Sequence, residues 1–136
     1  MFPDGTIAPL ATVLRMIAKA TDVIEVDIAD LSHDGRGVAR IEGKAIFVSG
    51  ALPGERVRLR RTGKHRHYDE AAVEEILQPS PDRVTPRCRH FGTCGGCALQ
   101  HLSAPAQIAA KQHVLLENLE RIGKVRPRTV LAALTD

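Results

Sequence analysis

Glu-Arg-Val-Arg-Leu-Arg-Arg, at residues 55–61, is the most informative stretch of this sequence for its fold. The apolar side chains Val57 and Leu59 alternate with arginines. Because successive side chains of a β-strand point to opposite faces, this alternation predicts a strand with one buried face and one arginine-bearing face. The stretch therefore indicates a sheet that covers a core on one side.

The neighbouring sequence, from residue 22 to residue 80, repeats this strand pattern. Apolar and acidic residues alternate over 24–28, and two β-prone runs, 38–41 and 44–48, are separated by Glu42-Gly43, a pair typical of a tight hairpin. Residues 68–77 form a fifth run, after a polar loop expected from Thr62 to His67. Turn residues occur at Ser32–Gly35 and Pro53-Gly54. Five short strands with such turns predict a small barrel, closed or nearly closed, because closure removes exposed strand edges.

Three further segments flank the predicted barrel. Residues 1–21 form an N-terminal extension with a possible short helix from Leu10 to Ala20. Prolines from Pro79 onward end the sheet, and residues 81–102 hold a linker and a cysteine-containing loop. The expected organisation is thus an extension, a barrel over 22–80, a cysteine loop, and a last segment over 103–136.

The last segment begins with a predicted helix. Ser103 is a candidate N-cap, Pro105 is tolerated in a first turn, and Gly123 suits a helix end, so we expect a helix from Ala104 to about Ile122. Residues 129–134 are a further strand or linker. One apolar stripe follows the helix at Ile108, Leu115, Leu119 and Ile122.

Composition limits the classes of function. The chain has 136 residues, 43% of them hydrophobic and 26% charged, which is typical of one globular domain. The sequence holds no membrane-length apolar run and no secretory signal pattern, so we expect a cytoplasmic protein. A net charge of +3 permits a polyanionic partner. Aromatic residues are only 3%, so a multi-aromatic base-stacking platform is not expected and any contact with RNA should be mainly electrostatic.

The cysteines indicate a metal or cluster site. Cys88, Cys94 and Cys97 have the spacing C-x5-C-x2-C in a glycine-rich segment, and an odd number of local cysteines argues against a disulfide framework. Three thiolates in such a loop can converge on one inorganic centre; the alternative is three free thiols. Zinc would need a fourth ligand, His101 or His90, whereas an iron–sulfur cluster usually needs a fourth cysteine, which this sequence lacks.

A basic cluster indicates phosphate binding. Glu55 is the only acidic residue between positions 51 and 68. Arginine binds phosphate oxygens in a bidentate manner, so this cluster predicts contacts that position RNA without reading its sequence; the alternative is a solvated strand face. Gly35-Arg36-Gly37 is more typical of a turn with positive φ than of an RNA contact. The predicted RNA-binding residues are Arg56, Arg58, Arg60, Arg61, Lys64 and Arg66.

Two motifs resemble a known family. Leu-Ser-His-Asp-Gly-Arg-Gly-Val-Ala at 31–39, Phe47-Val48 and Leu-Pro-Gly-Glu at 52–55 resemble a TRAM domain, an RNA-binding barrel. The segment 86–101, with its C-x5-C-G-G-C-x2-Q-H string, resembles the 4Fe-4S loop of bacterial 23S rRNA (uracil-C5)-methyltransferases. Radical-type methylthiotransferases also carry a TRAM domain, but with a different cluster spacing.

This resemblance implies a methyltransferase that depends on S-adenosylmethionine and methylates carbon 5 of a uridine in 23S rRNA. It implies a 4Fe-4S cluster on Cys88, Cys94 and Cys97 and ribosomal RNA as partner. The fourth cluster cysteine, the S-adenosylmethionine fold and the catalytic residues of that family lie farther along than this sequence extends. We therefore expect an RNA-binding N-terminal fragment, inactive by itself, with a labile or absent cluster and no assignable catalytic residue.

A stand-alone RNA-binding protein is the alternative to a methyltransferase fragment. In this second interpretation, Cys88, Cys94, Cys97 and His101 form a Cys3His zinc knuckle. The fourth ligand distinguishes the two, because His101 is required only for zinc. The sequence gives no indication of an oligomeric state.

Overall fold

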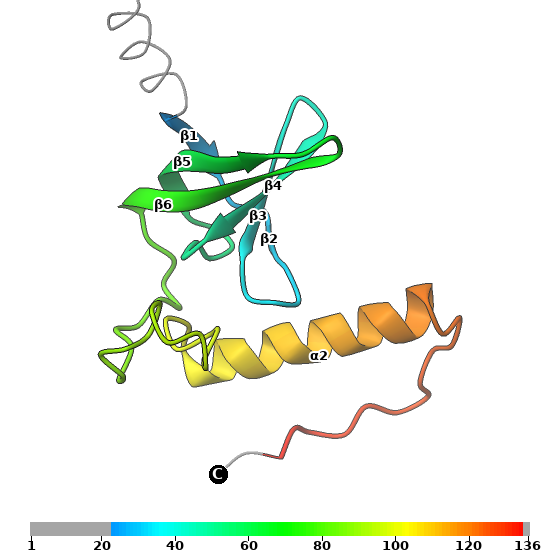
Figure 1. The fold of residues 1–136 in the computed structure, drawn as a ribbon. Helices are drawn as coiled ribbons and strands as arrows, with labels where there is room; N and C mark the ends of the chain where they lie inside the picture. Colours follow the sequence, from blue (N-terminus) through cyan, green and yellow to red (C-terminus); the bar gives the residue numbers. More distant parts are fainter. Residues whose placement is uncertain (1–22, 135–136) are drawn as a thin grey trace, which may run out of the picture.

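The computed structural model describes residues 23–134, which form a curled sheet followed by one long helix (Figure 1). This confirms the expected class, mainly β with one α-helix. The short helix expected over Leu10–Ala20 lies outside the described residues. Among the described residues the sheet has six strands rather than five, because a two-residue strand, Asp30–Leu31, follows the first predicted run.

The sheet has the order β1-β5-β6-β4-β3-β2. Neighbouring strands are antiparallel except β4 and β6, which pair in parallel. A hairpin connects β5 to β6. On its other edge β6 pairs with β4, so β6 lies between the strands β1 and β5 and the strands β4, β3 and β2. The strands are β1 (Val23–Asp27), β2 (Asp30–Leu31), β3 (Gly37–Ile41), β4 (Lys44–Ser49), β5 (Arg56–Lys64) and β6 (Tyr68–Gln78).

The two edge strands, β1 and β2, are consecutive in the chain. Between them the backbone N–H of Ile28 donates to the carbonyl of Glu55 (2.8 Å), and that of Ala29 donates to Val38 (2.9 Å). Residues 28 and 29 therefore hydrogen-bond first to Glu55, which precedes β5, and then to Val38 of β3. The sheet is barrel-like, but among the described residues its ladder does not close.

The hairpin tips refine the predicted boundaries. Glu42 (φ 51°) and Gly43 (φ 79°) both have positive φ, as a two-residue type I′ turn requires, which confirms the predicted β3–β4 hairpin. The polar loop expected over Thr62–His67 is wrong. β5 continues to Lys64, which pairs with Asp69 of β6, so the loop contains only residues 65–67. Register shifts in the β5–β6 ladder let the strand continue through Gly63.

The core lies inside the curled sheet. Val57 and Leu59 are fully buried, which confirms the alternation that predicted β5. A Cβ on Gly37 would lie 2.9 Å from side-chain atoms of Ala51 and Ile28, so this glycine is needed for space, not for a positive φ. The remaining members of the buried apolar cluster are Val26, Ile28, Ala39, Ile46, Val48, Ala51 and Ala71.

The helix α2 spans Ala104–Arg121 and confirms the predicted helix. Ser103 occupies the N-cap, yet its side chain makes no capping bond; its carbonyl accepts from the N–H of Gln107 (2.9 Å). At the other end Lys124 (φ 56°), not Gly123, has positive φ. A Cβ on Gly123 would meet the carbonyl oxygen of Leu119 at 2.8 Å, so glycine is needed there for close approach.

The surroundings of α2 are open. The helix has no buried residue, and residues 129–134 form no strand. Within the described range, no helix is long and apolar enough to cross a membrane.

Candidate RNA-binding surface and cysteine loop

The predicted arginine row lies on one face of β5, but carboxylates of the neighbouring strands pair with it. Arg58 donates to Glu25 of β1 (3.1 Å) and to Glu75 of β6 (2.7 Å). These acids are distant in sequence and become neighbours through the strand register, which pairs Arg58 with both. Arg56 pairs likewise with Asp27, and Arg60 with Glu74. The row is therefore largely neutralised.

Arg61 belongs to a different environment. Its side chain faces Asp69 at 3.6 Å, and the Asp69 residue is only 3% exposed. Lys44 donates to the same carboxylate at 2.7 Å, and this hydrogen bond is the main cause that lowers the pKa of Asp69. The charges of Lys44, Arg61 and Asp69 thus stabilise the sheet.

Lys64 and Arg66 differ from the other predicted RNA-binding residues. Both are exposed at the tip of the β5–β6 hairpin, and neither has a carboxylate partner among residues 23–134. Their charges do not have to leave an ion pair before they can contact a phosphate. Of the six predicted residues, these two present the most accessible positive charge.

An aromatic cluster next to this tip was missed by the composition argument. Phe47 of β4 and Tyr68 of β6 meet edge to face, with ring centroids 5.7 Å apart. His65 stacks on Tyr68 with centroids 4.4 Å apart and planes at 21°. The guanidinium of Arg36 lies 4.8 Å from the centre of the Phe47 ring. The parallel pairing of β4 with β6 brings these residues together, and the sequence carries no signal of that pairing.

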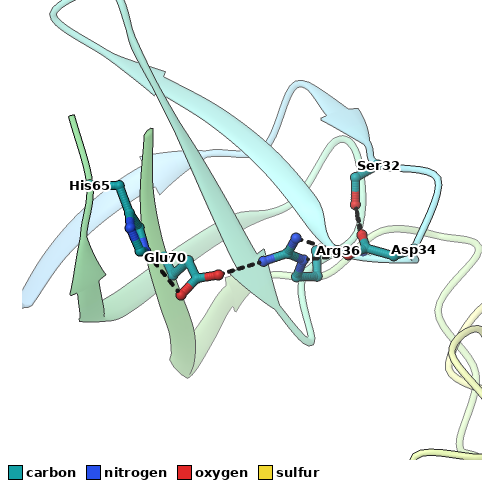
Figure 2. Close-up of polar contacts among 5 residues, drawn as sticks. All are labelled: Ser32, Asp34, Arg36, His65 and Glu70. Carbon is teal, nitrogen blue, oxygen red and sulfur yellow. Dashed lines mark hydrogen bonds and ion pairs between the residues drawn. The ribbon is translucent and has the colours of Figure 1, made fainter. Parts of the chain in front are cut away.

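Polar contacts hold Arg36 in this cluster (Figure 2). Its Nε donates to Asp34 (2.9 Å), and a terminal nitrogen donates to Glu70 (3.3 Å), whose other oxygen faces His65 Nε2 (3.5 Å). The hydrogen bond with Asp34 is the main cause that raises the pKa of Arg36. Burial opposes ionisation of Asp34, but bonds from Ser32 and Arg36 outweigh it and lower the pKa of Asp34.

The cysteine loop carries three exposed free thiols. Cys88, Cys94 and Cys97 line one cavity of about 40 Å³. Gly92 (φ 89°) and Gly95 (φ 77°) give the loop its tight turns, and the N–H of His90 faces Cys88 Sγ at 3.4 Å. In the part of the chain that the structure describes, no three His, Cys, Asp or Glu side chains are gathered as a metal site. The thiolate ligands therefore stay a prediction.

His101 lies apart from the cysteine cavity. The residue is 4% exposed, its ring centroid is 5.2 Å from that of Phe91, and neither ring nitrogen has a hydrogen-bond partner among the described residues. Burial, followed by the positive charge of Arg83, lowers the pKa of His101. Phe91 and His90 line the cavity of the cysteines, whereas His101 does not.

Glu55 connects the sheet to the cysteine segment. It is fully buried and accepts bonds from the N–H groups of Leu52 (2.7 Å) and Ser80 (3.1 Å) and from Arg83 Nε (2.7 Å). Burial disfavours its charge, but these donors outweigh burial and lower its pKa. Arg83 in turn forms a β-bridge with Leu102, just before α2. The sequence presented Glu55 only as the one acid of a basic run, so this role was not predicted.

A second contact joins the cysteine segment to the sheet. Gly35 has φ of +88° and lies against Ala98, so that a Cβ would be 3.0 Å from the carbonyl oxygen of Ala98. This glycine belongs to the turn that carries Arg36. The positive φ expected for the turn is confirmed at Gly35, and the cysteine segment packs directly on it.

The sequence of this chain is similar to that of known proteins. Residues 19–68 match the TRAM domain family. The chain is 63% identical over 113 residues to the 23S rRNA (uracil(1939)-C(5))-methyltransferase RlmD of Stenotrophomonas maltophilia (strain R551-3), covering 81% of this chain and 26% of that protein. It is 62% identical over 111 residues to the protein of the same name from Xanthomonas euvesicatoria pv. vesicatoria (strain 85-10), covering 79% and 25%. The chain thus spans about a quarter of the length of these relatives.

Proposed function

Since this chain carries a TRAM domain and corresponds to the N-terminal part of 23S rRNA (uracil-C5)-methyltransferases, we propose that it docks ribosomal RNA for such an enzyme. The observation that carries the proposal is the extent of the identity. A match over 81% of 136 residues has to include both the core of the sheet and the three cysteines, whereas a TRAM domain shared with another class would match the sheet alone.

The reaction proposed for the complete enzyme is transfer of a methyl group from S-adenosylmethionine to carbon 5 of a uracil in 23S rRNA. The relatives are named for uracil 1939, and we propose the same target here. Such an enzyme works in the cytoplasm. We assign no catalytic or S-adenosylmethionine-binding residue to this chain and expect the chain alone to transfer no methyl group.

The proposed contribution of this chain is electrostatic docking. Lys64 and Arg66 contact phosphates first, because they have no carboxylate partner among residues 23–134. Arg56 and Arg58 can contact a phosphate only if it replaces their present carboxylate partners, Asp27, Glu25 or Glu75. Arg60 and Arg61 likewise face Glu74 and Asp69, so we expect these four arginines to contribute less.

A 4Fe-4S cluster on Cys88, Cys94 and Cys97 is the proposed cofactor of the loop. The kind of donor fits, because thiolates are the usual ligands of such a cluster and all three cysteines line one cavity, although their side chains are not gathered as a metal site in the described residues. When bound, the cluster would tie three points of the loop to one rigid centre. The zinc alternative is less well supported, because its fourth ligand His101 does not line that cavity.

RNA binding tests the docking role. Fluorescence anisotropy with a single-stranded 23S rRNA fragment around the target uracil should show an affinity that falls with salt. The double variant Lys64→Ala/Arg66→Ala should lower the salt slope by about 1.4, roughly 0.7 for each single-strand phosphate that no longer meets a cation. Lys124→Ala/Arg128→Ala removes the same charge from the segment after α2 and is the matched control. Equal slopes for both double variants would refute docking by the hairpin tip.

Metal analysis tests the cofactor. Protein purified without oxygen should contain iron and acid-labile sulfide, which Cys88→Ser should lose and His101→Leu should retain. Zinc that is lost in His101→Leu would instead support the stand-alone zinc knuckle. A full iron content in Cys88→Ser would contradict the assigned ligands.

A further inference from the structure

We infer that His65 and Tyr68, backed by Phe47 and Arg36, form a surface on which bases of single-stranded RNA stack. This inference rests on the proposed function and adds to it a base-contacting surface beside the cations that contact phosphate. The low aromatic content argued against such a platform. That argument is incomplete, because composition counts aromatic residues without showing where they gather. Two of the three Phe and Tyr residues in the described part of the chain, Phe47 and Tyr68, lie in this one cluster.

The geometry is that of a stack left open to solvent. His65 and Tyr68 are nearly parallel, their centroids are 4.4 Å apart, and both are more than a third exposed. Rings buried in a core would make the same contacts without leaving area for a ligand. A nucleobase can extend this stack, because every base has a flat π-face and stacking tolerates any sequence.

The side chains that support the two stacked rings are themselves held in place by further contacts. Phe47 meets Tyr68 edge to face, and Arg36 covers the Phe47 ring. Asp34 and Glu70 hold the guanidinium there from two sides (Figure 2). A platform whose parts are already fixed loses little conformational entropy when a base binds.

The cations beside the stack favour RNA over an apolar protein partner, and the nearby carboxylate of Glu70 is paired with Arg36. Lys64 and Arg66 flank His65 in sequence, and both are exposed. A strand that stacks a base on His65 therefore passes two cations that lack carboxylate partners among residues 23–134 and suit its phosphates. An apolar protein partner would gain nothing from these charges.

Tyrosine fluorescence gives a direct test. Tyr68 is the single tyrosine, and the chain has no tryptophan, so its emission reports on this stack alone. Oligouridylate added to the full chain should quench the emission. An oligomer of the same length and backbone charge without bases should bind through its phosphates and leave the emission unchanged.

Substitution gives the second test. Tyr68→Ala should weaken binding of oligouridylate about fivefold or more, since stacking contributes about 1–3 kcal/mol per base. It should leave affinity for the abasic oligomer and the salt slope unchanged, and Tyr68→Phe should retain binding. Leu77→Ala is the matched control, because Leu77 lies on the same strand and is 36% exposed, like Tyr68.

The outcomes separate this inference from the proposed function. Salt-dependent binding with unchanged tyrosine emission and a neutral Tyr68→Ala variant would overturn the stacking surface and leave docking intact. Absence of binding to either oligomer at low salt would overturn both. An equal loss for Tyr68→Ala on both oligomers would also overturn stacking, because it would show a fault in the fold or in phosphate contact.

Discussion

The sheet over residues 23–78 and the segment over 79–134 are stabilised in different ways. The sheet has a continuous apolar core whose members are at most 7% exposed. In the second region only Ser80, His101 and Leu102 are buried, and α2 has no buried residue. Apolar burial thus holds the first region. The second region, a loop and one helix beside the sheet (Figure 1), is joined to the first by the ion pair between Glu55 and Arg83 and by the packing of Ala98 on Gly35.

From this contrast we infer that order in the cysteine loop depends on the sheet, while the sheet depends less on the loop. Glu55 is where the two regions meet, because its carboxylate is buried in the sheet and its partners Ser80 and Arg83 belong to the second region. Substitutions at Glu55, in the core and on the helix should therefore have effects of different size.

Glu55→Ala should have the largest effect. Removing the carboxylate leaves Arg83 and two backbone N–H groups without their partner, and breaking a buried pair in this way costs roughly 3–5 kcal/mol. Urea unfolding followed by Tyr68 fluorescence measures the loss. Glu75→Ala, which removes an exposed carboxylate, is the control and should cost at most about 1 kcal/mol. Equal costs for the two variants would show that Glu55 does not connect the regions.

Leu59→Ala should destabilise the sheet by roughly 2–5 kcal/mol, because Leu59 is fully buried and its truncation leaves a cavity. Since the second region depends on the sheet, both should unfold in one transition. Near- and far-ultraviolet circular dichroism should give the same urea midpoint for this variant. A far-ultraviolet transition that separates α2 from the sheet would contradict the dependence.

Acid should weaken the connection through Glu55. Its pKa is lowered in the folded state from an ordinary value of 4.5, so the unfolded state takes up a proton first as pH falls. The stability from Glu55 is therefore complete above about pH 4.5 and is lost as pH falls towards the lowered folded pKa. Glu55→Gln should flatten the decline of stability with pH by up to about 1.4 kcal/mol per pH unit in that window.

The control for this pH effect is Asp69→Asn. The pKa of Asp69 is also lowered, mainly by the hydrogen bond from Lys44, but Asp69 contacts only the sheet. Both variants should flatten the acid limb, whereas only Glu55→Gln should speed amide hydrogen exchange in residues 80–102, whose Ser80 and Arg83 bond to Glu55. If the two variants speed exchange there equally, the loop is not held through Glu55.

Much of the fold was predictable because local patterns determine it. The alternation around Val57 and Leu59 depends only on the period of a strand, and the Glu42-Gly43 turn depends only on positive φ. Both predictions were confirmed. The boundary error at Thr62–Lys64 arose because the β5–β6 ladder continues through polar residues, which pattern analysis treats as loop.

The site was less predictable because it depends on register between strands. The pairing of Arg58 with Glu25 and Glu75 follows from positions 33 and 17 residues away in sequence. The aromatic cluster likewise needs the parallel pairing of β4 with β6, which no local signal indicates. The sequence identified the charged residues, whereas their accessibility depends on the structure.

Leu115→Ala should have the smallest effect, within about ±0.5 kcal/mol in urea unfolding. Leu115 belongs to the apolar stripe that predicted α2, yet it is 58% exposed, so its truncation removes little area that folding takes from water. Sedimentation velocity on the same samples completes the test. A loss above about 1 kcal/mol together with a smaller sedimentation coefficient would mean that a second copy covers this face, because an exposed leucine stabilises only what packs against it. The second region would then be held by apolar burial after all, and its contrast with the sheet would disappear.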